Sequence, residues 1–182
     1  MTTKTFSFSK RIASPKEILI WVGTVALLTL SAKVQVPMIP VPITLQTAVV
    51  LALPCLFGTR MALASIGSYL ALGFMGAPVF ALGAAAGPAY FMGPTAGYLA
   101  GFMLAASLCG KIFEARKLNV AALFGLMTVG HAVLLGTGVL WLAYGFPSLG
   151  LHAAIASGLL PFLAGTVLKS AMAAAFVKAF RK

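Results

Sequence analysis

The fold class of this chain is decided by one stretch of sequence, Gly76-Ala-Pro-Val-Phe-Ala-Leu-Gly-Ala-Ala-Ala-Gly-Pro-Ala-Tyr-Phe-Met-Gly-Pro-Thr-Ala-Gly-Tyr-Leu-Ala-Gly-Phe102. It lies within residues 61–110, which contain no charged side chain. Its prolines and frequent glycines exclude a single regular helix. Uncharged, irregular backbone beside apolar helices is typical of membrane proteins, where it lines or covers a cavity. We therefore expect an integral membrane protein with its functional site near this segment.

The composition supports a membrane environment. The 182 residues are 61% hydrophobic and 8% charged, whereas a soluble domain carries roughly 25% charged residues. A net charge of +11 would suggest nucleic-acid binding in a soluble protein. Here the basic residues lie at the ends of apolar segments, so membrane lipid is the expected partner and nucleic acid is not. Cys55 and Cys109 lack metal or redox spacing and are predicted to pack in the core.

Six apolar segments are candidates for membrane spans, at residues 18–36, 44–57, 61–75, 95–112, 120–144 and 153–180. A helix needs about 20 apolar residues to cross a bilayer, so the second and third are short. Pro37, Pro40 and Pro42 precede the second, and short, proline-interrupted spans indicate a nearby binding site. The sequence predicts an all-α integral membrane protein, a single-domain six-transmembrane-helix bundle with an irregular Gly/Pro-rich outer loop.

The basic residues predict the orientation of these spans. Eleven of the 13 fall on one side of the six-span topology: Lys4, Lys10, Arg11, Lys16, Arg60, Lys111, Arg116, Lys117, Lys178, Arg181 and Lys182. The opposite loops, 37–43, 76–94 and 145–152, contain no Lys or Arg. By the positive-inside rule, both termini, including segment 1–16, are cytoplasmic. We expect a multi-pass protein of the bacterial inner membrane whose uncharged loop faces outward.

Two lysines depart from this pattern. Lys33 lies near the outer end of the first span, where its stem could extend to the membrane interface. Lys169 lies well inside the sixth span, where an ammonium normally has a partner. The two acidic residues of the chain, Glu17 and Glu114, are both cytoplasmic in this topology. Lys169 is therefore neutral, solvated by carbonyls and waters, or paired with a ligand, and we favour the ligand.

Other side chains are candidates for the same site. His131, in the middle of the fifth span, is most simply an interhelical hydrogen-bonding residue and alternatively a ligand contact. Thr44 and Gln46 open the second span and could bind the polar head of a ligand. Aromatic residues in and near the uncharged segment could supply apolar walls; these are Tyr69, Phe80, Tyr90, Phe91 and Tyr98.

Small residues recur along two of the spans, where they allow helix backbones to approach closely. Gly97, Gly101 and Ala105 are spaced by four residues in the fourth span. In the first span the spacing is three, at Gly23, Ala26, Thr29 and Ala32. Packing within the bundle is the simpler interpretation of both, and a docking face for another membrane protein is the alternative. The first-span stripe is our candidate for docking.

The chain lacks the motifs of the common enzyme classes. It has no G-x-x-x-x-G-K-[ST] loop for ATP, no G-x-S-x-G, no H-E-x-x-H and no Cys/His cluster. We therefore expect neither an enzyme nor a bound metal or cofactor. The absence of an intramembrane Asp or Glu counts against a proton relay. Transport by this chain would have to be downhill or powered by another subunit.

Several motifs of the chain closely resemble the BioY family. They are Val36-Pro-Met-Ile-Pro-Val-Pro-Ile-Thr-Leu-Gln46, Gly58-Thr-Arg60, Tyr69-Leu-Ala-Leu-Gly73, Gly76-Ala-Pro-Val-Phe80, Gly93-Pro-Thr-Ala-Gly-Tyr-Leu-Ala-Gly-Phe102, Gly130-His131 and Leu160-Pro-Phe162. BioY proteins are the biotin-specific, substrate-binding S components of energy-coupling-factor (ECF) transporters, and the resemblance covers residues 20 to 180. It implies a six-helix protein that captures biotin from outside. A transmembrane coupling (T) subunit and cytoplasmic ATPase subunits, which hydrolyse the ATP, would drive uptake, although some members act without a dedicated coupling module.

The resemblance also implies a binding role for the sixth span, with one departure. The family pattern is similar to P-F-x-x-G-D-x-x-K, whereas this chain reads Pro161-Phe-Leu-Ala-Gly-Thr166-Val-Leu-Lys169. Lys169 is kept and Thr166 replaces the acid. We expect Thr166 to bond the ureido ring and Lys169 to pair with the biotin carboxylate, or the ligand orientation to shift. The family's coupling motif A-x-x-x-A is not literally present, and the first-span stripe could take its place.

Two alternatives to biotin capture remain at this stage. A sibling S component for another small vitamin would differ only in its ligand. A membrane enzyme or a structural assembly protein would belong to a different class. The missing catalytic residues argue against the enzyme, and an unpaired intramembrane Lys169 argues against a purely structural role.

Overall fold

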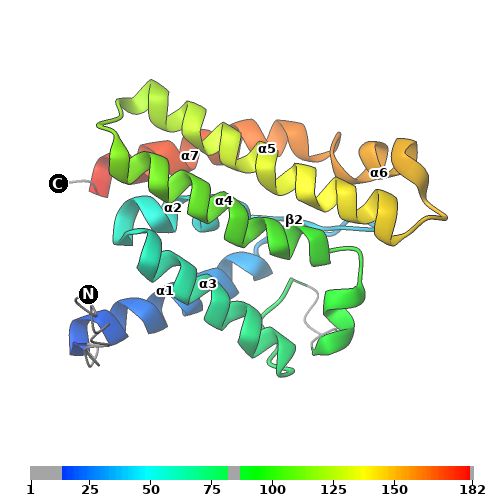
Figure 1. Cartoon of the computed structure of the whole chain (residues 1–182), viewed down its shortest axis with the longest axis horizontal. Helices are drawn as coiled ribbons and strands as arrows, with labels where there is room; N and C mark the ends of the chain where they lie inside the picture. The colour runs from blue at the N-terminus through cyan, green and yellow to red at the C-terminus, as the bar shows by residue number, and fades with distance from the viewer. Residues whose placement is uncertain (1–13, 82–86, 181–182) are drawn as a thin grey trace, which may run out of the picture.

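The computed structural model describes residues 14–81 and 87–180, which form an α-helical bundle (Figure 1). Its helices are α1 (Pro15–Lys33), α2 (Gln46–Phe57), α3 (Thr59–Phe74), α4 (Ala96–Ala115), α5 (Val120–Gly145), α6 (Gly150–Gly158) and α7 (Phe162–Phe180). A short 3-10 helix, η1 (Pro88–Met92), precedes α4. The start of α1 and the end of α7 lie at the same end of the bundle (Figure 1).

Four helices, α1, α4, α5 and α7, are long and apolar enough to cross a membrane, judged by length and composition within the described ranges. The second and third predicted spans correspond to α2 and α3, which have 12 and 16 residues and are shorter than these four helices, as expected. The described part of the predicted loop contains the 3-10 helix η1, with turns and bends on either side of it. Residues 82–86 of the predicted loop and residues 1–13 of the predicted N-terminal segment lie outside the described residues.

The predicted continuous sixth span at residues 153–180 is wrong, because this segment is two helices. α6 ends at Gly158 and α7 begins at Phe162. Pro161 lies between them, and a proline has no N–H to donate and collides with the carbonyl four residues earlier. Both Leu159 and Leu160 direct their N–H groups to the carbonyl of Ile155. α6 therefore ends before Pro161, and α7 begins after it as a separate helix.

The boundary between the first and second predicted spans is also wrong. The prediction placed residues 34–36 and 44–45 in helices, whereas β1 (Gln35–Val36) and β2 (Ile43–Thr44) form a small antiparallel hairpin. Gln35 pairs with Thr44, and Val36 pairs with Ile43. The three intervening prolines disfavour helix in their neighbours. The hairpin delivers the chain to the start of α2.

The two small-residue stripes have different surroundings. On α4, a Cβ atom on Gly97 would lie 2.7 Å from the carbonyl oxygen of Thr137, and one on Gly101 would lie 3.1 Å from that of Leu134. Both glycines therefore allow α4 to pack tightly on α5. On α1, a Cβ atom on Gly23 would meet nothing within 4 Å. Ala26 is exposed, Thr29 is half-buried, and Ala32 alone of this stripe is fully buried.

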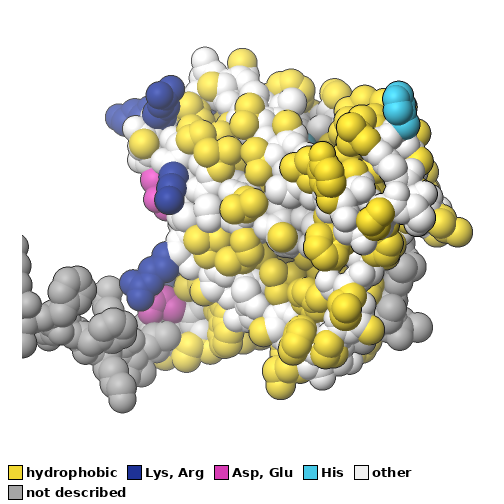
Figure 2. Space-filling model, turned by 45° about the vertical axis from the view of Figure 1, so that its right-hand side comes forward, with side chains coloured by type: hydrophobic (Ala, Val, Ile, Leu, Met, Phe, Trp, Pro, Cys, Tyr) yellow, Lys and Arg dark blue, Asp and Glu magenta, His cyan; other side chains and the backbone are white. Residues whose placement is uncertain are grey.

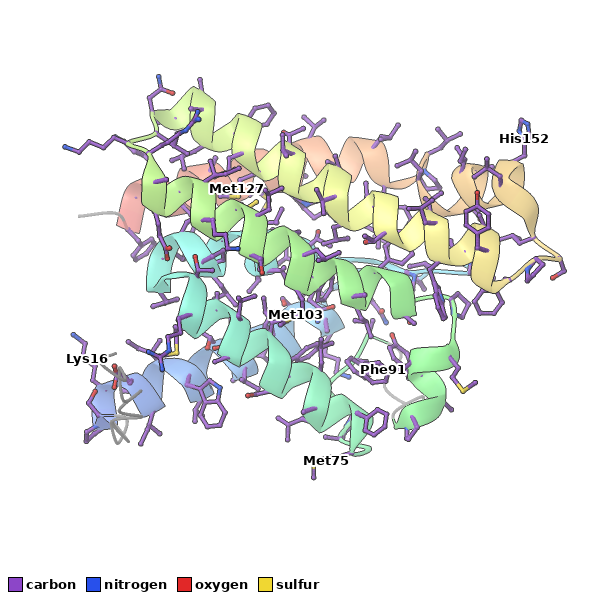
Figure 3. All side chains as sticks on the ribbon, in the orientation of Figure 1. Lys16, Met75, Phe91, Met103, Met127 and His152 are labelled. Carbon is purple, nitrogen blue, oxygen red and sulfur yellow. The ribbon has the colours of Figure 1, made fainter. Side chains whose placement is uncertain are left out.

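Charged side chains gather at one end of the molecule. Figure 2 shows the Lys and Arg side chains at this end, with the acidic side chains beside them and a largely hydrophobic surface elsewhere on this face. Lys16 lies at this end and His152 at the opposite one (Figure 3). Five basic residues of the predicted cytoplasmic set, at positions 4, 10, 11, 181 and 182, lie outside the described residues. Apart from Lys33 at the C-terminal end of α1 and the buried Lys169, the charged side chains of the described residues thus lie at one end of the bundle.

Candidate functional site

A cavity lies among α2, α4, α5, α7 and the segments around η1 and the hairpin. Its polar lining comprises Thr44, Gln46, Thr47, Tyr90, Thr95, Tyr98, His131, Thr166 and Lys169, and its apolar lining comprises Val41, Pro42, Ala81, Leu99, Phe102, Leu134, Leu135 and Phe162. The cavity volume is about 40 Å³. A single buried water needs roughly 10–15 Å³, so the cavity has room for a few waters. A larger ligand can enter only if the surrounding side chains move apart.

Lys169 of α7 brings a buried amine to this cavity. The residue is 6% exposed, and its Nζ donates to the carbonyl oxygen of Thr44 at 3.2 Å. Within residues 14–81 and 87–180 this is the hydrogen bond found for Nζ, and no carboxylate pairs with it. An ammonium has three donors, so two remain for another partner. Of the three alternatives for Lys169, solvation by carbonyls is thus met in part. One carbonyl accepts from the ammonium, and its two remaining donors are available to a ligand.

Gln46 and Thr166 each present a polar atom without a partner. Gln46 is 4% exposed and Thr166 is 7% exposed. Among the described residues, neither Gln46 Nε2 nor Thr166 Oγ1 has a hydrogen-bond partner. The Tyr69 hydroxyl donates to the carbonyl of Val79 at 3.2 Å, and its oxygen interacts with the Gln46 side chain without forming a full hydrogen bond to Nε2. Each such buried atom costs about 1–3 kcal/mol, which a ligand with matching polar groups would recover.

His131 connects three helices from the centre of α5. The residue is 1% exposed. Its Nδ1 lies 3.0 Å from the carbonyl oxygen of Met127, one turn earlier, and 3.0 Å from Ser170 Oγ of α7. Its Nε2 lies 3.1 Å from Thr47 Oγ1 of α2. Both ring nitrogens therefore have protein partners, in agreement with the simpler interpretation of an interhelical hydrogen bond, although the ring also lines the cavity.

The predicted aromatic wall separates into two layers. Tyr98 and Tyr90 line the cavity. Tyr69 and Phe80 are buried but do not line it: Phe80 stacks on Tyr90 with centroids 4.4 Å apart, and Tyr69 meets Phe80 edge to face at 5.3 Å. Phe91 also packs against Phe80, near the end of α3 (Figure 3). The structure therefore brings Tyr98 to the cavity and places Tyr69, Phe80 and Phe91 behind Tyr90.

The Tyr98 hydroxyl has a second role at the break between α6 and α7. It donates to the carbonyl oxygen of Gly158, the last residue of α6, at 2.8 Å. Carbonyls at a helix end have no partner within the helix, so this bond satisfies one of them inside the bundle. The Tyr98 ring also stacks on Phe162 at the start of α7, with centroids 6.0 Å apart. One side chain thus supports both sides of the break and one wall of the cavity.

Thr47 and Thr95 were not among the predicted binding residues, yet both line the cavity. A signal for them was present in the sequence. Thr47 directly follows Gln46, and Thr95 directly follows Pro94 at the start of an apolar segment. These are the positions that drew attention to Thr44 and Gln46. Polar residues that neighbour one another at the start of a span are therefore joint candidates for a cavity lining.

Lys33 lies outside the cavity and binds the chain that leads to it. Its Nζ donates to the carbonyl oxygens of Pro78 at 2.8 Å and Phe80 at 2.6 Å. The expectation that Lys33 extends to the membrane interface stays a prediction; in the structure the ammonium binds backbone carbonyls of the segment after α3. It fixes that segment next to the C-terminal end of α1.

The sequence was compared with known families and proteins. The family model of the BioY family matches residues 2–182. The probable biotin transporter BioY of Pyrococcus horikoshii is 34% identical over 158 residues, covering 87% of this chain and 91% of that protein. The biotin transporter BioY of Thermotoga maritima is 32% identical over 157 residues, covering 86% and 90%.

The fold was compared with solved structures. A crystal structure at 2.1 Å of the S-component for biotin from an ECF-type ABC transporter matches with a TM-score of 0.79. The two chains are 25% identical, and the match covers 91% of this chain and 90% of the other. The similarity therefore extends over nearly the whole of both chains, in sequence and in fold.

Proposed function

The chain belongs to the BioY family, and we propose that it captures biotin at the outer side of the membrane as the substrate-binding S component of an ECF transporter. It is a multi-pass membrane protein of a transporter family and not an enzyme. The observation that carries the proposal is the set of unsatisfied groups around one cavity. Lys169 has no carboxylate partner among the described residues, and neither Gln46 Nε2 nor Thr166 Oγ1 forms a full hydrogen bond there.

Biotin supplies the groups that this cavity lacks. Its carboxylate pairs with Lys169, because a charge-assisted hydrogen bond is stronger than a neutral one. Its ureido ring bonds Gln46 and Thr166, which can donate to the carbonyl oxygen. Its apolar body lies against Leu99, Phe102 and the ring of Tyr98, which line the same cavity. Thr44, whose carbonyl holds Lys169, keeps the amine oriented before the ligand arrives.

Membrane topology follows from the charged and uncharged ends. We count six crossings: α1, α2, α3, α4, α5, and α6 with α7 as one broken crossing. Broken helices are tolerated at membrane depth where they line a cavity, and Phe162, Thr166 and Lys169 of α7 do so. The positive-inside rule places the charged end, with both termini, in the cytoplasm. The uncharged end then faces outward, where biotin arrives.

Energy for uptake comes from partner subunits. The chain has no phosphate-binding loop of its own, so it needs no cofactor and ATP is hydrolysed by cytoplasmic ATPase subunits. A transmembrane T subunit connects them to this chain. We propose the exposed part of the α1 stripe, Gly23 and Ala26, as its docking face, because small residues let another helix approach closely.

Saturation binding of radiolabelled biotin to the purified full-length protein in detergent tests the proposal. We expect saturable binding that unlabelled biotin displaces and that riboflavin and thiamine do not. Displacement by another vitamin at lower concentration would assign the protein to a different ligand. No saturable biotin binding by a protein that elutes as a single folded species would contradict the proposed function.

A further inference from the structure

The hydrogen bonds of His131 define which of its nitrogens carries the proton. Nδ1 lies 3.0 Å from the carbonyl oxygen of Met127, and a carbonyl oxygen can only accept. Nδ1 must therefore be protonated, because two lone pairs at this distance would repel. Ser170 Oγ, also 3.0 Å from Nδ1, accepts from the same N–H.

The second nitrogen of His131 is consequently an acceptor. The ring is 1% exposed and shares its cavity with Lys169. A second positive charge there, with no carboxylate nearby among the described residues, would be strongly unfavourable. In a neutral ring with Nδ1 protonated, Nε2 carries a lone pair. The Thr47 hydroxyl, 3.1 Å away, therefore donates its hydrogen to Nε2.

This bond fixes the hydrogen-bonding character of Thr47. A free threonine hydroxyl rotates to donate or to accept. Once its hydrogen is directed to Nε2, Thr47 Oγ1 can offer only lone pairs to a further partner. Thr47 lines the cavity. We propose that His131 is a positioning residue that holds Thr47 as an acceptor for a ring N–H of the bound ligand.

The inference rests on the proposed function. It adds a hydrogen-bond acceptor for biotin to a cavity in which the groups assigned so far are donors. Lys169 Nζ and Gln46 Nε2 are donors, so they suit the carboxylate and the urea carbonyl of biotin. The cyclic urea also has two N–H groups that need acceptors when they leave water. Thr47, made an acceptor by His131, supplies one. A ligand of the same shape with an oxygen in place of that N–H would lose this hydrogen bond and bind more weakly.

Nitrogen-15 NMR tests the His131 state without any ligand. The chain has two histidines, and His152 can be removed by His152→Gln, so the imidazole signals can be assigned. We expect a protonated, pyrrole-type Nδ1 and an unprotonated, pyridine-type Nε2 for His131. The opposite tautomer, or a protonated Nε2, would overturn the inference whatever the protein binds.

Binding measurements test the role of Thr47. The ligands are biotin and two carbamate analogues, each with one ureido N–H replaced by a ring oxygen. Thr47→Val should weaken biotin about 3- to 10-fold, the equivalent of one neutral hydrogen bond. It should change the affinity for one carbamate analogue by less than about twofold, because that analogue has already lost the bond. Thr47→Ser, which keeps a hydroxyl, should bind biotin like the unsubstituted protein.

His131→Phe separates positioning from general support of the fold. We expect it to weaken biotin by a similar factor, and to have little further effect in the Thr47→Val background, because both changes remove the same bond. Equal losses for all three ligands, or additive losses in the double variant, would overturn the positioning role. Failure of the unsubstituted protein to bind biotin would instead contradict the proposed function.

Discussion

Two regions of this protein are built from similar residues and have different surroundings. Residues of α2, α4, α5 and α7 enclose the cavity, whereas no residue of α1 or α3 lines it. At the α4–α5 contact the glycines have no space for a side chain, whereas Gly23 of α1 and Gly67 of α3 have nothing within 4 Å. The first region is closed around the cavity, and the α1–α3 pair leaves Gly23 and Gly67 without a neighbour within 4 Å.

The difference shows what a small-residue stripe means in a membrane protein. Lipid chains are as apolar as leucine, so helices in a membrane associate through close contact rather than through the hydrophobic effect. A glycine that already contacts another helix of the same chain provides close packing within the bundle. A glycine that meets nothing remains available for a helix from another protein. The predictions below compare a substitution in the cavity-enclosing region with a matched one in the α1–α3 pair.

The largest difference is expected between Gly97→Leu and Gly23→Leu. The first pushes a side chain into the Thr137 carbonyl and Trp141 of α5, and overpacking of this kind costs about 3 kcal/mol or more. The second enters open space, and a surface change costs less than about 0.5 kcal/mol. Thermal unfolding in the same detergent measures both. Equal stability of the two variants would contradict the description of α4–α5 as closed.

Substitutions of Lys169 and Lys33 should differ in their effect on biotin affinity. Lys169→Met should weaken biotin about 10- to 100-fold, because it removes a charge-assisted hydrogen bond worth about 1.5–3 kcal/mol. Lys33→Met should weaken it by less than about threefold, because Lys33 holds backbone carbonyls outside the cavity.

Biotin methyl ester provides the control for the lysine comparison. The ester lacks the carboxylate charge, so the unsubstituted protein and Lys169→Met should bind it with similar affinity. A variant that loses biotin and its ester equally would show that Lys169 supports the cavity in another way.

A smaller difference is expected between two side-chain hydrogen bonds. Tyr98→Phe leaves the buried carbonyl of Gly158 without its donor and should lower the free energy of unfolding by about 1–2 kcal/mol. Ser68→Ala removes the acceptor of Trp21 Nε1 in the α1–α3 pair. Because that bond is exposed, the loss should be below about 0.5 kcal/mol. Denaturation in mixed micelles ranks the two, and a larger loss for Ser68→Ala would reverse the comparison.

The smallest effect on the isolated protein should come from Gly23→Leu combined with Ala26→Leu. Both positions are exposed, so biotin affinity should change by less than about twofold. Uptake of biotin by cells that contain the coupling subunits should nevertheless fall, because the added side chains hold another helix away. Full uptake with normal binding would contradict the docking role of this face.

The sequence predicted the site where a single residue differs in type from its neighbours along the chain. Lys169 and Gln46 were predicted because a charge or a polar group inside an apolar segment stands out locally, and Thr166 because it replaces the acid of the family pattern; all three line the cavity. The gathering of most basic residues on one side of the predicted spans could likewise be read from the sequence alone. Pro161 also carried a local signal, yet the unbroken apolar character of residues 153–180 led to one predicted span where there are two helices.

The remaining features depend on how distant segments meet. Thr47 and His131 are 84 residues apart, and only the rotation of α2 and α5 about their axes brings them into contact. Tyr69 and Phe80 were indistinguishable in sequence from Tyr98, and their place behind Tyr90 follows from the path of the segment after α3. The hairpin of β1 and β2 has two residues per strand, which is too short for a periodic pattern to reveal.

The bond between Lys33 and the segment after α3 has a consequence for how the chain is inserted during synthesis. The carbonyls of Pro78 and Phe80 lie 45 and 47 residues after Lys33. When α1 leaves the ribosome and enters the membrane, neither acceptor has yet been made. The Lys33 ammonium acquires these partners only after α3 and the segment that follows it have been made. We therefore infer that α1 and α3 become a stable unit together, and that the order of translation delays their pairing until the third helix is complete.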